Sequence, residues 1–297
     1  MTRVLVTGGA GFIGSNLVNE LIKQNYGIFV IDNLCESKRK NVNSKAGFFK
    51  LDICNYKSIL PVFKDVKYVF HLAALPRVQF SIENPRQTHL VNIDGTLNVL
   101  QASREQGVKR IIFSSSSSVY GKQTTLPIKE TAHLNPLSPY ALHKIIGEQY
   151  CKLFSELYNL ETICLRYFNV YGNGQTGDSP YATAIAKFLQ LKNENKPITI
   201  FGDGEQTRDF VNVLDVVSAN ILAMKNKKIG NGEIINICSG KKHSINQIAN
   251  LISNNRIYLP AKKGEPKNSI GDNSLAKKLL NWTPKISLEE GIKKLLW

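Results

Sequence analysis

The sequence predicts an α/β fold: a doubly wound parallel sheet with a smaller C-terminal lobe interleaved with it. Three observations predict this. In the first half of the chain, short β-branched runs that are apolar throughout alternate with longer amphipathic segments. A glycine-rich turn follows the first of these runs. Beyond about residue 172 the alternation gives way to a less regular order of segments. Because strands that are apolar on both faces need cover on both faces, the first half is predicted to be a parallel sheet between helices.

Each element of the first half is predicted from its periodicity. Uninterrupted apolar, β-branched runs indicate buried strands, and apolar residues three and four apart indicate helices. The predicted strands are Val4–Thr7, Ile28–Ile31, Phe48–Leu51, Tyr68–Leu72, Arg110–Ser114 and Thr162–Tyr167. The predicted helices are Ser15–Gln24, Tyr56–Val62, Gly95–Gln106 and Pro139–Tyr158.

The second half begins with a loop at Gly172–Pro180, which is rich in Gly, Asn, Asp and Ser. The elements predicted after it are a helix at Tyr181–Leu191, a strand at Ile198–Phe201, a helix at Leu214–Met224 and a strand at Ile234–Ile237. Ile234–Ile237 is apolar enough to be a buried strand, so we expect it to return to the sheet. We therefore expect a first domain at 1–171, to which 210–240 returns, and a smaller lobe at 172–209 and 241–297.

Composition sets limits on the function. The 297 residues include 38 Lys and Arg against 23 Asp and Glu, a net charge of +15. From Leu222 to Trp297 there are 14 basic and 5 acidic residues, so this segment carries +9 of the +15. Such an excess raises the question of a polyanionic partner.

The five cysteines are odd in number, lie far apart and form no C-x-x-C pair, which argues against a disulfide framework or a metal site. Reduced thiols are typical of a cytoplasmic protein. No apolar run approaches the about 20 residues of a membrane helix. We therefore expect a cytoplasmic protein with no membrane segment and no metal.

The glycine-rich turn at Thr7–Gly14 has glycines at 8, 9, 11 and 14 and satisfies both G-x-G-x-x-G and G-x-x-G-x-x-G. It follows a predicted strand and opens a predicted helix, which is the context that this motif requires. Glycine permits the tight turn and lets backbone N–H groups approach a pyrophosphate, and the helix N-terminus adds partial positive charge. The motif therefore predicts a dinucleotide site.

Asp32 indicates which dinucleotide binds, because it ends the second predicted strand eighteen residues after the last glycine of the motif. A carboxylate there accepts hydrogen bonds from a ribose diol and repels a 2′-phosphate, so NAD is favoured over NADP. Asp52 and Ile53 end the third strand, near the adenine, and His71–Ala74 ends the fourth, beside the pyrophosphate. His71 itself is expected to be a packed histidine rather than a catalyst, since its neighbours are apolar.

Tyr140 and Lys144 are four residues apart and share one face of a predicted helix. The ammonium is expected to lower the pKa of the phenol from its usual value of about 10, which would make a phenolate base available near neutral pH. Five serines, Ser114–Ser118, follow a buried strand. Ligands of doubly wound sheets bind beyond the carboxyl ends of the strands, so several of these hydroxyls should face the same site.

With these segments in place, the chain resembles the extended short-chain dehydrogenase/reductases, in the NAD-dependent nucleotide-sugar epimerase/dehydratase group, from Val4 to about Pro284. Within the group it most resembles the UDP-glucose (UDP-galactose) 4-epimerases and the related UDP-N-acetylglucosamine 4-epimerases. The segments that carry the resemblance are Thr7–Gly14, Asp32-Asn33, His71–Ala74, Asn92–Thr96, Phe113–Gly121, Tyr140–Lys144, Arg166–Gly172 and Arg208–Phe210.

The resemblance implies a Rossmann domain and a role for each matching residue. Ser116 matches the catalytic hydroxyl, Tyr140 the base and Lys144 the lysine of the cofactor ribose. The implied NAD residues are Gly8, Gly11, Phe12, Ile13, Gly14, Asp32, Asn33, Asp52, Ile53, Leu72, Ala73, Ala74, Asn92, Ser114, Tyr140, Lys144 and Tyr167. The implied substrate residues are Ser116, Tyr140, Asn169, Thr199, Phe201, Arg208, Lys262, Glu265 and Ser269.

The substrate residues have distinct implied tasks. Asn169 and Arg208 would bind the diphosphate, and Phe201 would pack against the uracil. Where the family commonly has Arg-Pro-Gly-Asp, this chain has Lys262 at the arginine and Glu265 at the acid that meets the uridine ribose; lysine neutralises phosphate without bidentate geometry. Ser269 falls where a bulky residue restricts the family to glucose and galactose, so its small side chain suggests that N-acetylated sugars are also accepted.

The serines at 116–118 separate the members of the group. The 4,6-dehydratases have an Asp-Glu pair just before Val-Tyr-Gly, and the UDP-glucuronate decarboxylases have a Glu there, whereas this chain has only serines. The resemblance therefore implies epimerisation at C4 through a 4-keto sugar, and a homodimer formed by the helices Gly95–Gln106 and Pro139–Tyr158.

Two alternatives remain open. One is a UDP-glucuronate 4-epimerase, which has a similar serine run. The other is an NAD-binding protein that uses its basic surface to bind RNA; the presence of Ser116, Tyr140 and Lys144 and the absence of an aromatic–basic RNA motif argue against it. We therefore expect a UDP-sugar partner and no nucleic acid.

Overall fold

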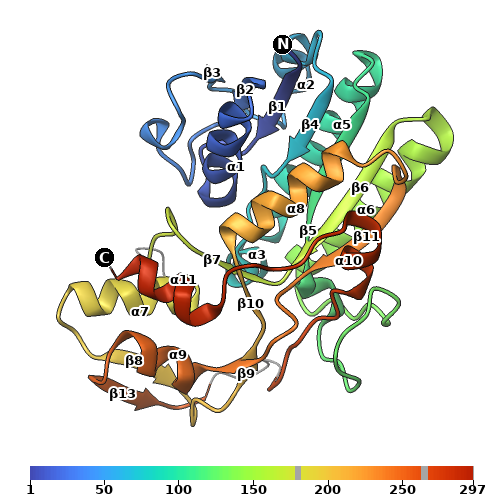
Figure 1. The fold of residues 1–297 in the computed structure, drawn as a ribbon. Helices are drawn as coiled ribbons and strands as arrows, with labels where there is room; N and C mark the ends of the chain where they lie inside the picture. Colours follow the sequence, from blue (N-terminus) through green and yellow to red (C-terminus); the bar gives the residue numbers. More distant parts are fainter. Residues whose placement is uncertain (178–181, 262–266, 297) are drawn as a thin grey trace.

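The computed structural model describes residues 1–177, 182–261 and 267–296, and it confirms the predicted class: a seven-stranded parallel sheet lies between two layers of helices (Figure 1). Its strands are β1 (Arg3–Thr7), β2 (Gly27–Ile31), β3 (Gly47–Phe49), β4 (Tyr68–His71), β5 (Arg110–Ser116), β6 (Glu161–Tyr167) and β11 (Asn231–Ile237). Their order is β11-β6-β5-β4-β1-β2-β3. The order reverses between β1 and β4, and doubly wound sheets bind ligands beyond the strand ends at such a point.

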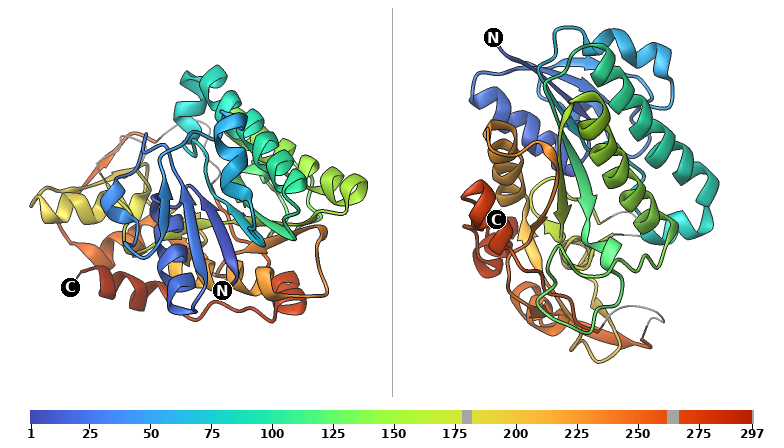
Figure 2. Two further views of the ribbon diagram at one scale, coloured as in Figure 1. Left: turned by 90° about the horizontal axis from the view of Figure 1, so that it is seen from above. Right: turned by 90° about the vertical axis from the view of Figure 1, so that its right-hand side faces the viewer.

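Helices cover both faces of the sheet. The helices that pack on it or beside it are α1 (Phe12–Lys23), α2 (Tyr56–Ile59), α3 (Val78–Glu83), α4 (Pro85–His89), α5 (Gly95–Glu105), α6 (Pro139–Tyr158), α8 (Val213–Lys225) and α10 (Ser274–Leu280). The short 3-10 or π segments are η1 (Arg39–Asn41), η2 (Leu60–Phe63), η3 (Leu90–Asp94) and η4 (Ser117–Tyr120). The right-hand view of Figure 2 shows α1, α8 and α10 on one face and α5 and α6 on the other.

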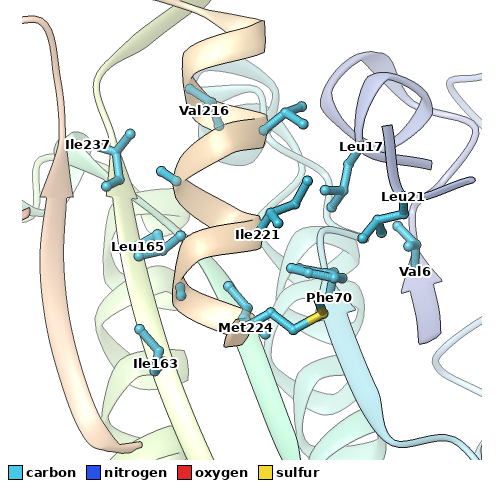
Figure 3. Packing of buried hydrophobic residues seen from close by; sticks show 14 of the residues in the cluster. Val6, Leu17, Leu21, Phe70, Ile163, Leu165, Val216, Ile221, Met224 and Ile237 are labelled. Carbon is cyan, nitrogen blue, oxygen red and sulfur yellow. The ribbon is translucent and has the colours of Figure 1, made fainter. Parts of the chain in front are cut away.

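The core follows from the alternation of side chains along each strand. Val4 and Val6 of β1 point into the cluster under α1 and α8, whereas Leu5 between them joins the cluster under α5 and α6. Figure 3 shows the first cluster, in which Leu17 of α1 and Ile221 of α8 point toward one another. Each such side chain, fully buried, stabilises the fold by about 1.5–3 kcal/mol.

The smaller lobe has a core of its own, below the sheet in Figure 1. Its elements are α7 (Ala184–Asn193), β8 (Ile198–Phe201), α9 (Ile245–Ile252), β13 (Arg256–Leu259) and α11 (Leu288–Leu295). β8 pairs in parallel with β13. Two short ribbons lie between this lobe and the sheet: β7 (Asn169–Tyr171) pairs with β10 (Phe210–Asn212), and β9 (Thr207–Arg208) pairs with β12 (His243–Ser244).

The structure differs from the sequence prediction in helix bounds, in unpredicted elements and in the lobe boundary. Beyond Tyr167, the unpredicted elements are β7, β9, β10, β12, α9, β13, α10 and α11. The helix predicted to begin at Tyr181 begins at Ala184, with Tyr181 outside the described residues. The helices between Val78 and Asp94 were not predicted, because they are short and interrupted at Asn84-Pro85. The predicted return of 210–240 to the sheet is not one of these differences, since β11 pairs with β6.

The third difference concerns the lobe boundary. The prediction places 241–297 in the smaller lobe, but α10 and Trp282 pack in the cluster under α1 and α8. Trp282 is fully buried, and its Nε1 donates to Asp215 O at 3.0 Å and Ser218 Oγ at 2.9 Å. The chain therefore returns twice to the first domain. In the described part of the chain, no helix is long and apolar enough to cross a membrane.

Candidate active site

The glycine-rich turn after β1 is built so that only glycine fits. Gly8 has φ +72°, and a Cβ added there would lie 2.7 Å from Ala73 N. A Cβ on Gly14 would lie 2.2 Å from Gly8 O. The turn therefore packs Gly8 against the loop after β4 and places the N-terminus of α1, with its partial positive charge, directly after it.

The carboxylate of Asp32 at the end of β2 is 9% exposed and accepts three hydrogen bonds: from Ala10 N at 3.0 Å, Leu34 N at 2.9 Å and Ser37 Oγ at 2.9 Å. It therefore joins the glycine-rich turn to the loop after β2. An acid fixed at this place is what binding of the adenosine ribose requires.

The ends of β2 and β3 are tied together by Asn33 and Asp52. Asn33 Nδ2 donates to Asp52 Oδ2 at 2.9 Å, and Cys54 N donates to Asp52 Oδ1 at 2.8 Å. Burial raises the pKa of Asp52, but these hydrogen bonds more than offset it and hold the pKa below its usual value. Asp52, predicted to lie near the adenine, is thus held against the loop after β2.

His71 is a packed histidine, as predicted. Its Nδ1 lies 2.7 Å from Thr7 Oγ1 and its Nε2 lies 3.0 Å from Thr96 Oγ1. Burial, and to a lesser extent the charge of Lys144, lowers the pKa of His71 to about 3, so the ring is neutral. Asn92 is likewise buried, and its side-chain amide bonds both backbone groups of Leu75 and shapes the loop after β4.

Tyr140 and Lys144 lie on α6, which Ser138 caps by accepting from Ala141 N at 3.2 Å. Lys144 Nζ donates to Ser114 O at 2.6 Å, and the Ser116 side chain hydrogen-bonds with that of Tyr140. The structure therefore brings together the three residues predicted to be catalytic, at the carboxyl end of β5.

The expected lowering of the Tyr140 pKa by Lys144 is not what the structure shows. Burial raises the pKa of Tyr140 to about 12, and the Ser116 hydrogen bond and the charge of Arg77 only partly offset it. The Lys144 ammonium lies 5.7 Å from the centre of the Tyr140 ring and is itself buried, which lowers its pKa to about 8. Desolvation outweighs charge here, so the phenol is neutral at neutral pH.

Two charged residues of this site were missed by the sequence prediction. Arg77 lies in the segment between β4 and α3, its Nε 4.0 Å from Glu36 Oε2, and its charge acts on the Tyr140 phenol. Glu148 follows Lys144 by one helical turn on α6. Two features of the sequence could have revealed them. Arg77 follows the predicted pyrophosphate segment His71–Ala74, and Glu148 repeats the four-residue spacing of Tyr140 and Lys144.

The predicted cofactor residue Tyr167 ends β6, and the predicted substrate residues Asn169 and Arg208 lie on β7 and β9. Tyr167 Oη donates to Asn220 Oδ1 at 2.9 Å, and Asn169 Nδ2 donates to Asp209 O at 2.8 Å. Arg208 lies on β9 next to this carbonyl, and Ser269 N donates to Thr207 O at 3.1 Å. Asn169, Arg208 and Ser269 are therefore linked through the backbone between Thr207 and Asp209.

The buried carboxylate of Asp209 anchors these segments, since it accepts from Ser239 N at 2.7 Å, Gly240 N at 3.0 Å and Gly271 N at 3.1 Å. Thr199 and Phe201, predicted for the uracil, lie on β8 of the smaller lobe, with Phe201 36% exposed. Lys262 and Glu265 lie outside the described residues.

Residues 4–238 match the family described as the NAD dependent epimerase/dehydratase family. The chain belongs to this family. The NAD that this family uses fits the site, because the cradle between Gly8, Gly14 and Ala73 is one that any side chain would fill.

Members of the epimerase/dehydratase family that resemble the chain act on different sugars. A putative UDP-glucose 4-epimerase of Methanocaldococcus jannaschii is 42% identical over 301 residues, covering 99% of this chain and 97% of the relative. A UDP-glucuronate 4-epimerase of Thermodesulfobacterium geofontis is 38% identical over 316 residues, covering 99% and 95%.

A solved structure extends the comparison. The UDP-N-acetylglucosamine 4-epimerase of Methanobrevibacter ruminantium M1, in complex with UDP-N-acetylmuramic acid, has a TM-score of 0.94 and 37% identity, covering 99% of this chain and 97% of that one. The fold and the enzyme class of UDP-sugar epimerases and dehydratases are thus shared, while the sugars named for these relatives differ.

Proposed function

We propose that this protein is a UDP-sugar 4-epimerase, an isomerase that inverts C4 of a UDP-hexose through a 4-keto sugar. The observation that carries the proposal is the grouping of Ser116, Tyr140 and Lys144 at the carboxyl end of β5, in the same sheet whose β1 ends in the glycine-rich turn. Serines rather than acids at 117 and 118 support epimerisation over elimination or decarboxylation, which need an acid or base there.

The proposed roles follow from position. Tyr140 takes the proton of the sugar O4 and later returns it, and Ser116 hydrogen-bonds the same oxygen. The chemistry that bound NAD supplies is reversible hydride transfer at C4. Gly8–Gly14 would hold its pyrophosphate, Asp32 the adenosine ribose and Lys144 the second ribose. Because burial raises the pKa of the Tyr140 phenol, its ionisation depends on the charges and hydrogen bonds around it.

The substrates we propose are UDP-glucose and UDP-galactose, with UDP-N-acetylglucosamine and UDP-N-acetylgalactosamine also accepted. Support comes from Ser269, whose backbone is bonded to Thr207 next to Arg208, so a small side chain borders the predicted diphosphate residues. Asn169 and Arg208 would bind the diphosphate, and the guanidinium suits that task.

UDP-glucuronate is the second candidate substrate. The observation that favours it is the Arg77 cation acting on Tyr140, since such a charge beside the reacting sugar could also neutralise a carboxylate.

The test is to incubate the purified protein separately with UDP-glucose, UDP-N-acetylglucosamine and UDP-glucuronate and to identify the products by NMR. C4 epimers of the first two and none of the third are expected. Tyr140→Phe should lower turnover at least about 100-fold because it removes the base, and should leave NAD binding intact. Near-normal turnover in that variant, or no epimer from any sugar, would overturn the proposal.

We also infer that the protein is a cytoplasmic homodimer. Its five cysteines are free, and a stripe of exposed leucines runs along α6: Leu142, Leu153 and Leu157 are 46%, 45% and 64% exposed. The occupant proposed for this stripe is α6 of a second copy, as the family resemblance implies.

A further inference from the structure

Three consecutive serines of β5 each hold a different residue on one face of α6. Ser114 O accepts from Lys144 Nζ at 2.6 Å, and Ser115 Oγ donates to Glu148 Oε1 at 2.5 Å. Ser116 hydrogen-bonds with Tyr140. Positions 140, 144 and 148 are successive turns of one helix face, so the third residue belongs to the same row as the two predicted to be catalytic.

Glu148 is fixed from two sides. Its side chain and that of Arg166 are 0% and 2% exposed, and the pair is bidentate: Arg166 Nε donates to Oε1 at 2.8 Å and Nη2 donates to Oε2 at 2.6 Å. Arg166 Nη1 in turn donates to Tyr120 Oη at 2.9 Å, and Tyr120 Oη donates to Asn236 Oδ1 at 2.7 Å. The carboxylate is therefore locked into a network that joins α6, η4, β6 and β11.

Glu148 is also the carboxylate that acts on Lys144. Burial lowers the pKa of Lys144, and the charge of Glu148 is the largest effect that opposes it. The aromatic ring under the ammonium is Phe113, with its centre 4.8 Å from Nζ. The other titratable groups that face Lys144 are Tyr140, His143 and Cys151 of α6, His71 of β4 and Cys164 of β6.

We propose that Glu148 is a positioning residue of the reacting site: its carboxylate, held by Ser115 and Arg166, keeps Lys144 in the ammonium form beside Tyr140. Arg166 limits this effect, because its positive charge partly neutralises the Glu148 carboxylate that acts on Lys144. The role in catalysis rests on the proposed epimerase function, since it acts through Lys144.

The test uses two single variants that move the charge in opposite directions. Glu148→Gln keeps the size and the hydrogen bond to Ser115 but removes the negative charge. Arg166→Met removes the cation that partly neutralises the Glu148 carboxylate. Each single variant leaves a buried charge without its partner, which destabilises the fold. The double variant removes both charges and so keeps the test available if a single variant does not fold.

The first measurement is independent of turnover: the titration of Lys144 in the protein with ¹³C-labelled lysine, followed by NMR and assigned with Lys144→Arg. From a midpoint of about 8, it should fall by about one pH unit in Glu148→Gln, fall by less in the double variant because the Arg166 cation is also gone, and rise in Arg166→Met. The second measurement is the alkaline limb of kcat/KM against pH, which should move in the same directions.

The matched control is the ion pair at the other end of the same two strands, where Arg110 Nη2 lies 2.6 Å from Glu161 Oε2. Glu161→Gln should lower stability without moving either readout. An unchanged midpoint in the double variant, or shifts of the same sign in both single variants, would overturn the inference. If the midpoints shift as expected but the wild-type protein epimerises no UDP-sugar, the proposed function fails and the effect of Glu148 on Lys144 stands.

Discussion

Tyr140 can act as a base only if its buried hydroxyl ionises, and the charges around it decide how readily that occurs. Arg77 is the cation that lowers the pKa of this phenol in the structure. Arg77→Gln should therefore raise that pKa and shift the acid limb of kcat/KM to higher pH. A shift of half to one unit lowers kcat/KM at pH 7 roughly three- to tenfold.

The control for this prediction is Arg86→Gln, because Arg86 is exposed on α4, a few residues along the chain. That variant should leave the pH profile unchanged. A profile of Arg77→Gln that coincides with the wild-type profile would show that the guanidinium does not act on the base.

Individual site residues could be predicted where their role follows from residues close by in the sequence. The glycines of 8–14, Asp32 after a strand, and Tyr140 with Lys144 are defined by spacing within a single strand or helix. Arg77 and Glu148 could not be predicted, because their effects come from contacts made across elements. The same reason explains the Tyr140 pKa: the pair is visible in the sequence, but its burial is not.

At the scale of elements, the close approach of α6 to β5 depends on Gly147. A Cβ there would lie 2.4 Å from Cζ of Phe113, a buried ring that lies beneath the Lys144 ammonium. In an open helix Gly→Ala gains about 1 kcal/mol. Here we expect overpacking to prevail, so that Gly147→Ala lowers the free energy of unfolding by about 1–2 kcal/mol.

Because the same contact sets the distance from Lys144 to Ser114, turnover of Gly147→Ala should fall as well. Urea unfolding and steady-state kinetics measure the two effects. Gln149→Ala, on the exposed side of α6, is the control and should change neither. A more stable Gly147→Ala protein with full turnover would mean that Phe113 moves aside and that the helix position is not critical.

The elements themselves were predictable where the pattern is long and uniform, as in α6 and in the buried strands. They were not predictable in the segment 78–94, where α3, α4 and η3 are each only five or six residues long. Such short helices have too few turns to show a period, and they hold their shape through packing: Ser81 of α3 accepts from Tyr140 N at 3.1 Å.

For the whole molecule, the lobe boundary could be predicted only in part. The pattern of 210–240 indicates a strand that returns to the sheet, and β11 does so. The second return, through α10 and Trp282, is made by apolar residues too few to show a pattern. These residues pack in the cluster under α1 and α8. The sequence alone does not reveal that this cluster has room for them.

The assembly of the molecule gives the last prediction. On α6, Leu142, Leu153 and Leu157 lie within one face, opposite the face of Tyr140 and Lys144. Leu153→Lys with Leu157→Lys should therefore convert the proposed dimer to a monomer without touching the reacting site. Sedimentation velocity measures the change.

Since each chain carries +15, the two copies repel each other, and wild-type dimers should dissociate more at low ionic strength than at high. Leu259→Lys, on exposed β13 of the smaller lobe, should leave the dimer intact. A dimer that survives the double substitution, or that weakens as salt is added, would assign the interface to another surface.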